Sequence, residues 1–156
     1  MVVVERTSLL LADADTVWAR VTTPAGVNDE LRPWMRMTVP AGWRDRSIAD
    51  VTSGTHIGRS WILLLGVVPF DVDDLTIAEI GPRRFVERSP LLSAAQWQHE
   101  RTVTPHGFGC RLEDRLTFEP RALTAVIPGG VRLHTAVVRA IFAHRHRRLV
   151  RSFGAA

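Results

Sequence analysis

The chain has 156 residues, of which 46% are hydrophobic and 23% are charged, and its formal net charge is +4. This balance is typical of one globular domain that buries its own core without disulfides or metals. The single cysteine, Cys110, excludes an internal disulfide and any site built from several cysteines. All 20 Lys and Arg residues are arginine and tyrosine is absent, which excludes phenol chemistry and, outside the terminal amine, Schiff-base chemistry.

The sequence contains no predicted membrane span. Its longest apolar run, residues 61–70, is too short for one and includes Gly66 and Pro69. The first residues have no basic region before their apolar stretch and carry Glu5, unlike a signal peptide, so we expect a cytoplasmic protein. We expect it to be a monomer or a homodimer. The basic stretch at 144–151 is interpreted as a solvated helix end; attraction to an acidic partner or anionic membrane is the alternative, and no nucleic acid is expected.

The first part of the chain predicts a strand followed by two short helices. Residues 2–11 are β-branched and apolar, as in a strand. Asp13 is a predicted N-cap, and Thr23-Pro24 repeats that signal for a second helix that ends near Leu31. The first helix shows the amphipathic spacing i, i+3, i+4, i+7 at Ala14, Val17, Trp18 and Val21.

The rest of the chain predicts an antiparallel meander and one long helix. Residues 34–39 are a possible second strand, and 41–58 give no clear signal. Turn residues then recur at hairpin spacing and divide the chain into strands at 59–65, 70–80, 84–89, 94–104 and 108–119. Pro128-Gly129-Gly130 opens a helix over 130–151, and Gly154 follows it. We expect its first half to be buried broadly and its second half only along a stripe at Phe142, Leu149 and Phe153.

This order of elements resembles that of the START-like or SRPBCC superfamily. The segments GRSWILLLGVVPFDVDDL, GPRRFVERSP, QWQHERTVTPHGFGCRLEDRLTFEPR and IFAHRHRRL resemble those of uncharacterised bacterial members. The resemblance implies one α+β domain over 1–156 with the helix-grip fold, in which six or seven antiparallel strands wrap around the C-terminal helix and leave an apolar cavity. Members include lipid and hormone carriers, pollen allergens and polyketide cyclases, so the fold alone does not choose a function.

Side-chain alternation predicts polar groups on the inner face of the sheet. The nearly perfect alternation of 108–119 places Asp114 inward between leucines. The same periodicity places His99 and Arg101 inward beside Trp97, and Glu87 inward on the strand before. Because buried charge is costly unless paired, these groups must pair with one another or with a ligand.

Three interpretations of this polar group remain open. Arg101 forms a structural bridge with Asp114 or Glu87, with His99 satisfied beside it. Alternatively the group anchors the polar end of a ligand, or His99, Asp114 and Glu87 supply acid and base catalysis. The predicted ligand-binding set, which adds aromatic and helix residues facing the cavity, is Trp61, Glu87, Trp97, His99, Arg101, Asp114, Val137 and Ile141.

Other patterns indicate structural roles or no site. His144 and His146 are two apart on a helix and cannot chelate one ion together, and His146 is expected to pack or cap. Asp71, Asp73 and Asp74 lack the glycine turn and terminal glutamate of a calcium loop, and we expect them to face solvent. No metal is predicted. No GxGxxG, P-loop or GxSxG pattern occurs, so no nucleotide cofactor is expected either.

The sequence therefore favours the binding of a hydrophobic small molecule, such as a lipid, polyketide or isoprenoid-like compound. The alternative implied by the resemblance is a polyketide cyclase or aromatase-like enzyme that uses inward His and carboxylate groups for proton transfer. Some cyclases of the superfamily have a tyrosine in the pocket, and this chain has none. A third hypothesis is an interaction module that uses the arginine-rich helix end.

Overall fold

The computed structural model describes residues 1–156, and its elements follow the predicted order closely. The strands are β1 (Val2–Leu10), β2 (Met35–Met37), β3 (Thr55–Leu64), β4 (Val68–Gly81), β5 (Arg84–Ser89), β6 (Ala94–His106) and β7 (Gly109–Pro120). The helices are α1 (Ala14–Val21), α2 (Pro24–Leu31), the single 3₁₀ turn η1 (Ile48–Asp50), α3 (Ala122–Val126) and α4 (Gly130–Phe153). None of these helices is long and apolar enough to cross a membrane.

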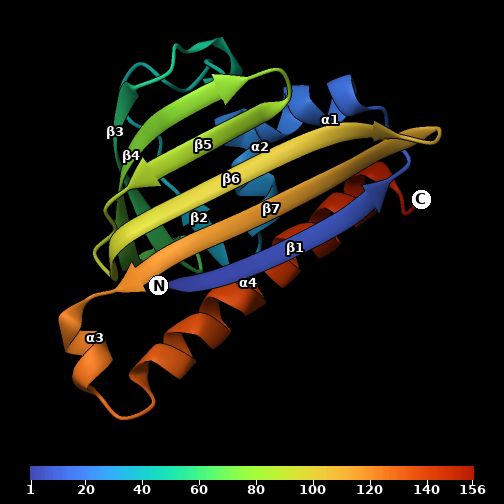
Figure 1. Ribbon diagram of the computed structural model, residues 1–156. Coiled ribbons are helices and arrows are strands. Elements are labelled where there is room, and N and C mark those ends of the chain that lie inside the picture. The colour runs from blue at the N-terminus through green and yellow to red at the C-terminus, as the bar shows by residue number, and fades with distance from the viewer.

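All seven strands form one antiparallel sheet in the order β1-β7-β6-β5-β4-β3-β2. The sheet curls, and α4 crosses its concave side (Figure 1). Because β1 and β2 are the two edges of the sheet, the α1–α2 pair carries the chain from one edge to the other. This arrangement confirms the predicted α+β helix-grip architecture.

The core follows from the alternation that the sequence shows. On β7, Leu112, Asp114, Leu116 and Phe118 are all buried, and Cys110 packs among them with no exposed surface. One apolar cluster joins β7 to α1 and the end of α4, and a second joins it to the middle of α4. The sheet therefore holds the helix at two places, and the space between sheet, α2 and α4 is left for a site.

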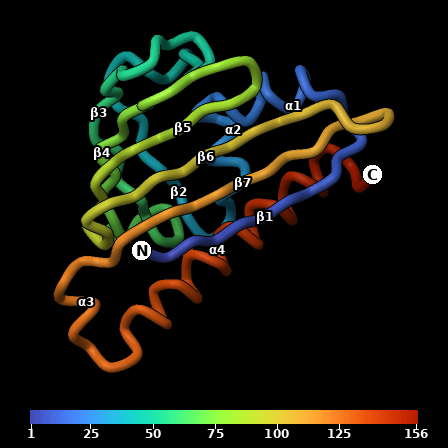
Figure 2. Tube along the Cα trace, viewed as in Figure 1, coloured from blue at the N-terminus to red at the C-terminus, as the bar shows by residue number.

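Glycines at both ends fix the limits of α4. Gly129 precedes it with a left-handed φ of 75°, and Gly154 ends it with a φ of 80°, conformations that glycine adopts without steric cost. The chain then returns to β1, where the Leu11 amide donates to the Gly154 carbonyl at 3.2 Å. The C-terminus consequently lies beside the end of β1 (Figure 2).

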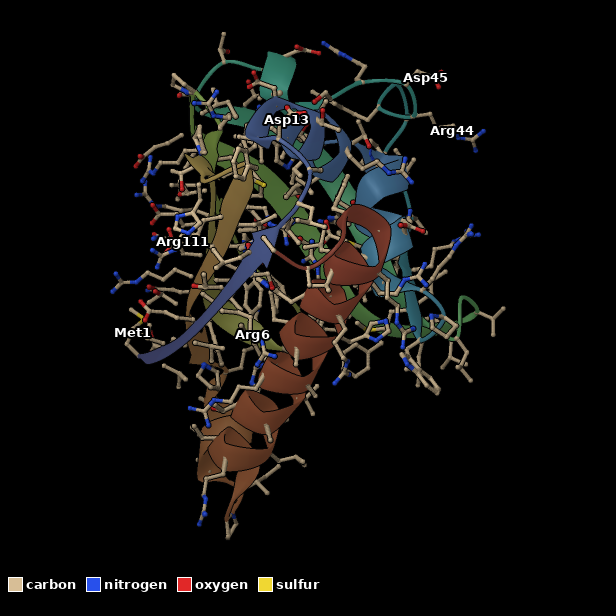
Figure 3. All side chains as sticks on the ribbon, turned by 90° about the vertical axis from the view of Figure 1, so that its right-hand side faces the viewer. Met1, Arg6, Asp13, Arg44, Asp45 and Arg111 are labelled. Atoms are coloured by element: carbon tan, nitrogen blue, oxygen red, sulfur yellow. The ribbon has the colours of Figure 1, made fainter.

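The structure differs from the prediction for two helices, α4 and α3. The first half of α4 is not broadly buried, since its first turns project beyond the sheet together with α3 (Figure 1), and Leu133 is 68% exposed. The short helix α3 was not predicted at all. The loop of residues 41–54, where no element was assigned, contains only η1, and its Arg44 and Asp45 point away from the molecule (Figure 3).

The corner between α1 and α2 is tight. Asp13 caps α1 by accepting from the Thr16 amide at 2.9 Å, and Thr23 caps α2 by accepting from the Gly26 amide at 3.1 Å. A Cβ on Gly26 would lie 1.9 Å from the Arg20 carbonyl oxygen. Glycine is therefore required here, one helical turn before Glu30, by close contact rather than by its dihedral angles.

We expect Gly26→Ala to lower the free energy of unfolding by about 1–3 kcal/mol, because the added methyl group forces α1 and α2 apart. Urea denaturation measures this. Gly81→Ala is the control, since a Cβ there meets nothing within 4 Å, and its effect should stay within about 0.5 kcal/mol. Equal effects from the two substitutions would contradict a tight corner.

Candidate functional site

A cavity of about 220 Å³ lies between the concave face of the sheet, α2 and α4. Of the 35 residues that line it, 20 are hydrophobic. The apolar wall includes Leu31, Ile57, Ile62, Phe85, Val138 and Phe142. The charged and imidazole groups on the same wall are Arg46, Asp71, Asp73, Glu87, His99, His134 and Arg145.

Behind this cavity, Arg101 of β6 is completely buried between two carboxylates. Its Nε donates to Asp114 Oδ1 and its Nη2 to Asp114 Oδ2, both at 2.7 Å. Its Nη1 and Nη2 donate to Glu30 Oε1 and Oε2 of α2 at 2.8 and 3.0 Å. The planar guanidinium thus makes paired contacts on both edges, the geometry that suits arginine and not lysine.

Asp114 accepts four hydrogen bonds from the protein, so its acceptor capacity is used and none remains for a ligand. Besides Arg101, its partners are Nε2 of His99 at 2.8 Å and Nε2 of His146 at 2.9 Å. Because an ionised carboxylate only accepts, both imidazoles carry their proton on Nε2. Nδ1 of His146 then accepts from the Ser8 hydroxyl at 2.7 Å, whereas Nδ1 of His99 faces Glu87 Oε2 at 3.8 Å.

The helix α4 contributes a second guanidinium to this network. Arg145 donates from Nε to Glu30 Oε2 at 2.8 Å and lies over the Phe142 ring. Two carboxylates, Glu30 and Asp114, therefore face two guanidinium groups, Arg101 and Arg145. This balance of buried charge makes the network stable without any group from solvent.

The pKa values of the network follow from this pairing. Burial acts to raise the pKa of Glu30 and of Asp114, but the arginines outweigh it and hold both below their usual values, Asp114 well below. Burial acts to lower the pKa of Arg101, and the two carboxylates raise it instead. Burial lowers the pKa of His146. Both carboxylates are consequently ionised and His146 is neutral at pH 7.

The predicted site residues divide between the cavity and the network. Glu87, Trp97, His99, Val137 and Ile141 line the cavity, and their contact with a ligand stays a prediction. Two others, Arg101 and Asp114, are buried as expected but lie behind the wall. They form the structural bridge that was one of the open interpretations, with Glu30 as the second partner in place of Glu87.

The placement of Trp61 on the cavity wall was wrong. Its neighbours Ser60 and Ile62 line the cavity, while Trp61 points to the opposite face of β3 and is 48% exposed. Of the other tryptophans, Trp43 lines the cavity from the loop before β3, and Trp34 does not. The aromatic side chains of the wall therefore come from the loop before β3 and from β4, β5, β6 and α4, and not from β3 itself.

The expectation that Asp71 and Asp73 face solvent was also wrong. Both are buried on the inner face of β4, and only Asp74 points outward, where it pairs with His56 at 2.8 Å. Asp71 is satisfied by Ser93, whose amide and hydroxyl both donate to it. Burial first, and then the charge of Glu87, raise the pKa of Asp73 to about 10, so its carboxyl group is protonated at neutral pH.

Glu30 and Arg145 were not anticipated as part of the site. Glu30 lies four residues after Gly26, so both are on the same buried face of α2. Arg145 falls on the stripe that runs from Phe142 to Leu149, and His146 beside it is packed as expected. The spacing along each helix thus contained a signal for both residues.

Solved structures of other proteins share this fold. The chain aligns with protein CV1439 from Chromobacterium violaceum at 15% identity and a TM-score of 0.69, covering 99% of each chain. A START superfamily protein from Mycobacterium smegmatis aligns at 13% identity and a TM-score of 0.60, covering 96% of this chain and 92% of that one. DynU16, from the dynemicin biosynthetic locus, aligns at 18% identity and a TM-score of 0.57. The alignment covers 97% of this chain and 48% of the DynU16 chain.

These similarities show that the chain has the START-like, helix-grip fold that its sequence resemblance implied. It belongs to the family described as "Domain of unknown function (DUF8410)", whose model matches residues 8–153. Among curated proteins, no sequence matches the chain.

We expect Asp114→Asn to lower the free energy of unfolding by about 3–5 kcal/mol, because it leaves buried Arg101 without one of its two charged partners. Chemical denaturation of the two proteins measures the difference. Glu113→Gln is the matched control, since Glu113 is the next residue on the other face and pairs with Arg111 near solvent. A stable Asp114→Asn variant that had lost ligand binding would instead make Asp114 a ligand contact.

Proposed function

We propose that the protein binds one apolar small molecule in the cavity between the sheet and α4. The observation that carries this proposal is the cavity itself. Protein interiors are closely packed, so a core that binds no ligand would fill this space with side chains. Its walls are mostly apolar, with a few polar groups that converge from β4, β5 and β6. That combination is typical of small-molecule sites. The START-like fold of the neighbouring structures supports the same reading.

The size of the cavity supports a small ligand. Its volume of about 220 Å³ lies below the range of about 300–1000 Å³ common for drug-sized ligands. A diacyl lipid does not fit such a space. Among the compounds that the sequence favours, a short polyketide or isoprenoid-like molecule with one ring system or one chain is therefore the better match.

The ligand's polar contacts come from Glu87 and His99. Arg101 and Asp114 lie behind the wall with their hydrogen-bonding groups occupied, so their role is to hold α2, β6, β7 and α4 in place around the ligand. Trp97 and Phe142, whose ring centroids are 6.5 Å apart, offer flat apolar surface beside those polar groups.

An enzyme that moves protons in a bound polyketide-like chain is the second candidate. The specific observation in its favour is the orientation of His99, whose Nε2 donates to Asp114 while Nδ1 faces Glu87, and both His99 and Glu87 line the cavity. A carboxylate behind an imidazole is a common arrangement for a general base. Conversion of a bound substrate, lost in His99→Gln but not in Trp34→Ala, would move this candidate ahead.

Binding of a neutral fluorescent probe, N-phenylnaphthylamine, tests the cavity directly. We expect saturable binding with one probe per chain and a blue-shifted emission from an apolar environment. We expect Val137→Trp to weaken that binding at least tenfold, because the indole occupies the cavity wall that Val137 lines.

The control for this substitution lies one residue away. Ala136 is exposed on the solvent side of the same turn of α4, so Ala136→Trp adds the same indole without entering the cavity. It should leave the affinity within about twofold of the original, a change within the usual range for surface substitutions. Equal binding by both variants, with both folded, would place the probe outside the cavity.

A further inference from the structure

Two carboxyl groups on the cavity wall receive no hydrogen bond from an N–H group of the protein. Asp73 of β4 and Glu87 of β5 are 5% and 6% exposed, and both line the cavity. Asp73 Oδ1 and Glu87 Oε1 are buried without a hydrogen-bond partner. The other buried carboxylates, Glu30, Asp71 and Asp114, all accept hydrogen bonds from the protein. Asp73 and Glu87 are therefore the buried acidic groups of the cavity wall that no N–H group of the protein pairs with.

Burying two carboxyl groups beside each other is costly for the protein alone. A buried acceptor without a donor loses its hydration and gains nothing in return. The two groups reduce the cost by sharing a proton, since Asp73 hydrogen-bonds to Glu87 and the pKa of Asp73 rises to about 10. The pair still carries one negative charge, and a cationic ligand that took the place of the shared proton would neutralise that charge.

The surroundings of the pair favour a positively charged ligand. Asp71 adds a third carboxyl group to the same strand. The two guanidinium groups on the wall are engaged elsewhere, Arg145 by Glu30 and Arg46 over the Trp43 ring. Aromatic side chains that attract cations through their ring faces line the cavity from β5, β6 and α4: Phe85, Trp97 and Phe142.

We propose that Asp73 and Glu87 bind an organic ammonium group, so that the ligand is an apolar amine rather than a carboxylic acid. This inference rests on the proposed function and names the chemical class of its ligand. The ammonium takes the place of the shared proton and donates N–H groups to both carboxylates, and its apolar part fills the space toward Ile141 and Val138. A metal ion is a poorer match, because no group of three or more His, Cys, Asp or Glu side chains is placed to hold one.

The test compares three probes that share an eight-carbon chain: octylamine, octanol and octanoate. We expect octylamine to bind at least about tenfold more tightly than octanol and octanoate to bind most weakly, because hydrogen bonds to charged groups are the strongest available here. Isothermal titration at about pH 7.5 measures the three affinities, a pH at which a primary amine is charged.

Variants then assign the preference to the pair. Asp73→Asn and Glu87→Gln keep the shape of each side chain, and each should remove the advantage of octylamine over octanol. Asp74→Asn is the control, since Asp74 is on the outer face of the same strand and pairs with His56, and it should retain the advantage. Circular dichroism establishes that each variant is folded, and the comparison of probes on the unaltered chain stands even if one is not.

The shared proton gives the amine a distinctive pH dependence. Because a bound ammonium displaces the proton held by Asp73, its affinity should rise by up to about tenfold per pH unit from about pH 7.5 to about pH 9, while that of octanol stays flat. The other titratable groups on the wall are Arg46, Asp71, His99, His134 and Arg145, and this window lies above the usual histidine range. A flat or falling profile for octylamine would contradict the role of Asp73.

The outcomes separate this inference from the proposed function. If N-phenylnaphthylamine binds in the cavity but octylamine shows no advantage, the amine inference fails and the cavity stands. If octanoate binds best, the polar contact is with a cation such as Arg145 and the inference is overturned. If neither the neutral probe nor any of the three chains binds, the proposed function itself fails.

Discussion

The buried guanidinium of Arg101, held between Glu30 and Asp114, is the constraint on which the rest of this structure depends. It is made by residues 71 positions apart along the chain, and it joins the α1–α2 pair to the centre of the sheet. Asp114 extends the contact to His146, and Glu30 extends it to Arg145, so α4 is fixed at two points. Breaking any one partner leaves another charge buried and unpaired, which is why the elements around the cavity behave as a unit. The same contacts explain why part of the arginine-rich helix end is not a free basic surface: Arg148 donates to Asp29, as Arg145 does to Glu30.

The molecule treats its buried charges in two different ways, and the difference locates the site. Around Arg101 every charge is matched and every acceptor is filled, so the network needs nothing from outside. Across the cavity, Asp73 and Glu87 share one proton and have no arginine as a partner. His99 lies between these two regions. Its Nε2 donates a hydrogen bond to Asp114 in the first, and its Nδ1 faces Glu87 in the second. A rigid network of matched charges beside a carboxyl pair that keeps a net negative charge suits a preorganised receptor for a cation, because the network holds the surrounding elements in place.

Much of the fold could be predicted from the sequence because local patterns and tertiary burial agree there. The alternation on β7 identified its inner face and hence Asp114, and the caps at Asp13 and Thr23 identified two helices. The failures have local causes. Acidic residues lie on both faces of β4, so alternation alone did not show which face Asp71 and Asp73 occupy. The run of apolar residues from Trp61 onward has no alternation, and Trp61 was assigned to the wrong face. The spacing on α2 places Glu30 on the same face as Gly26, but its partner is an arginine from a distant strand, which no feature of an eight-residue helix reveals.

The most direct test of this account is native mass spectrometry of the protein taken from its own cells, followed by extraction and identification of what it carries. The account predicts one molecule per chain, apolar, smaller than a diacyl lipid and bearing a basic nitrogen. A protein that emerges empty, and that remains empty after incubation with an extract of the same cells, would contradict it. In that case the buried carboxyl groups of Asp73 and Glu87 would have no ligand to explain them.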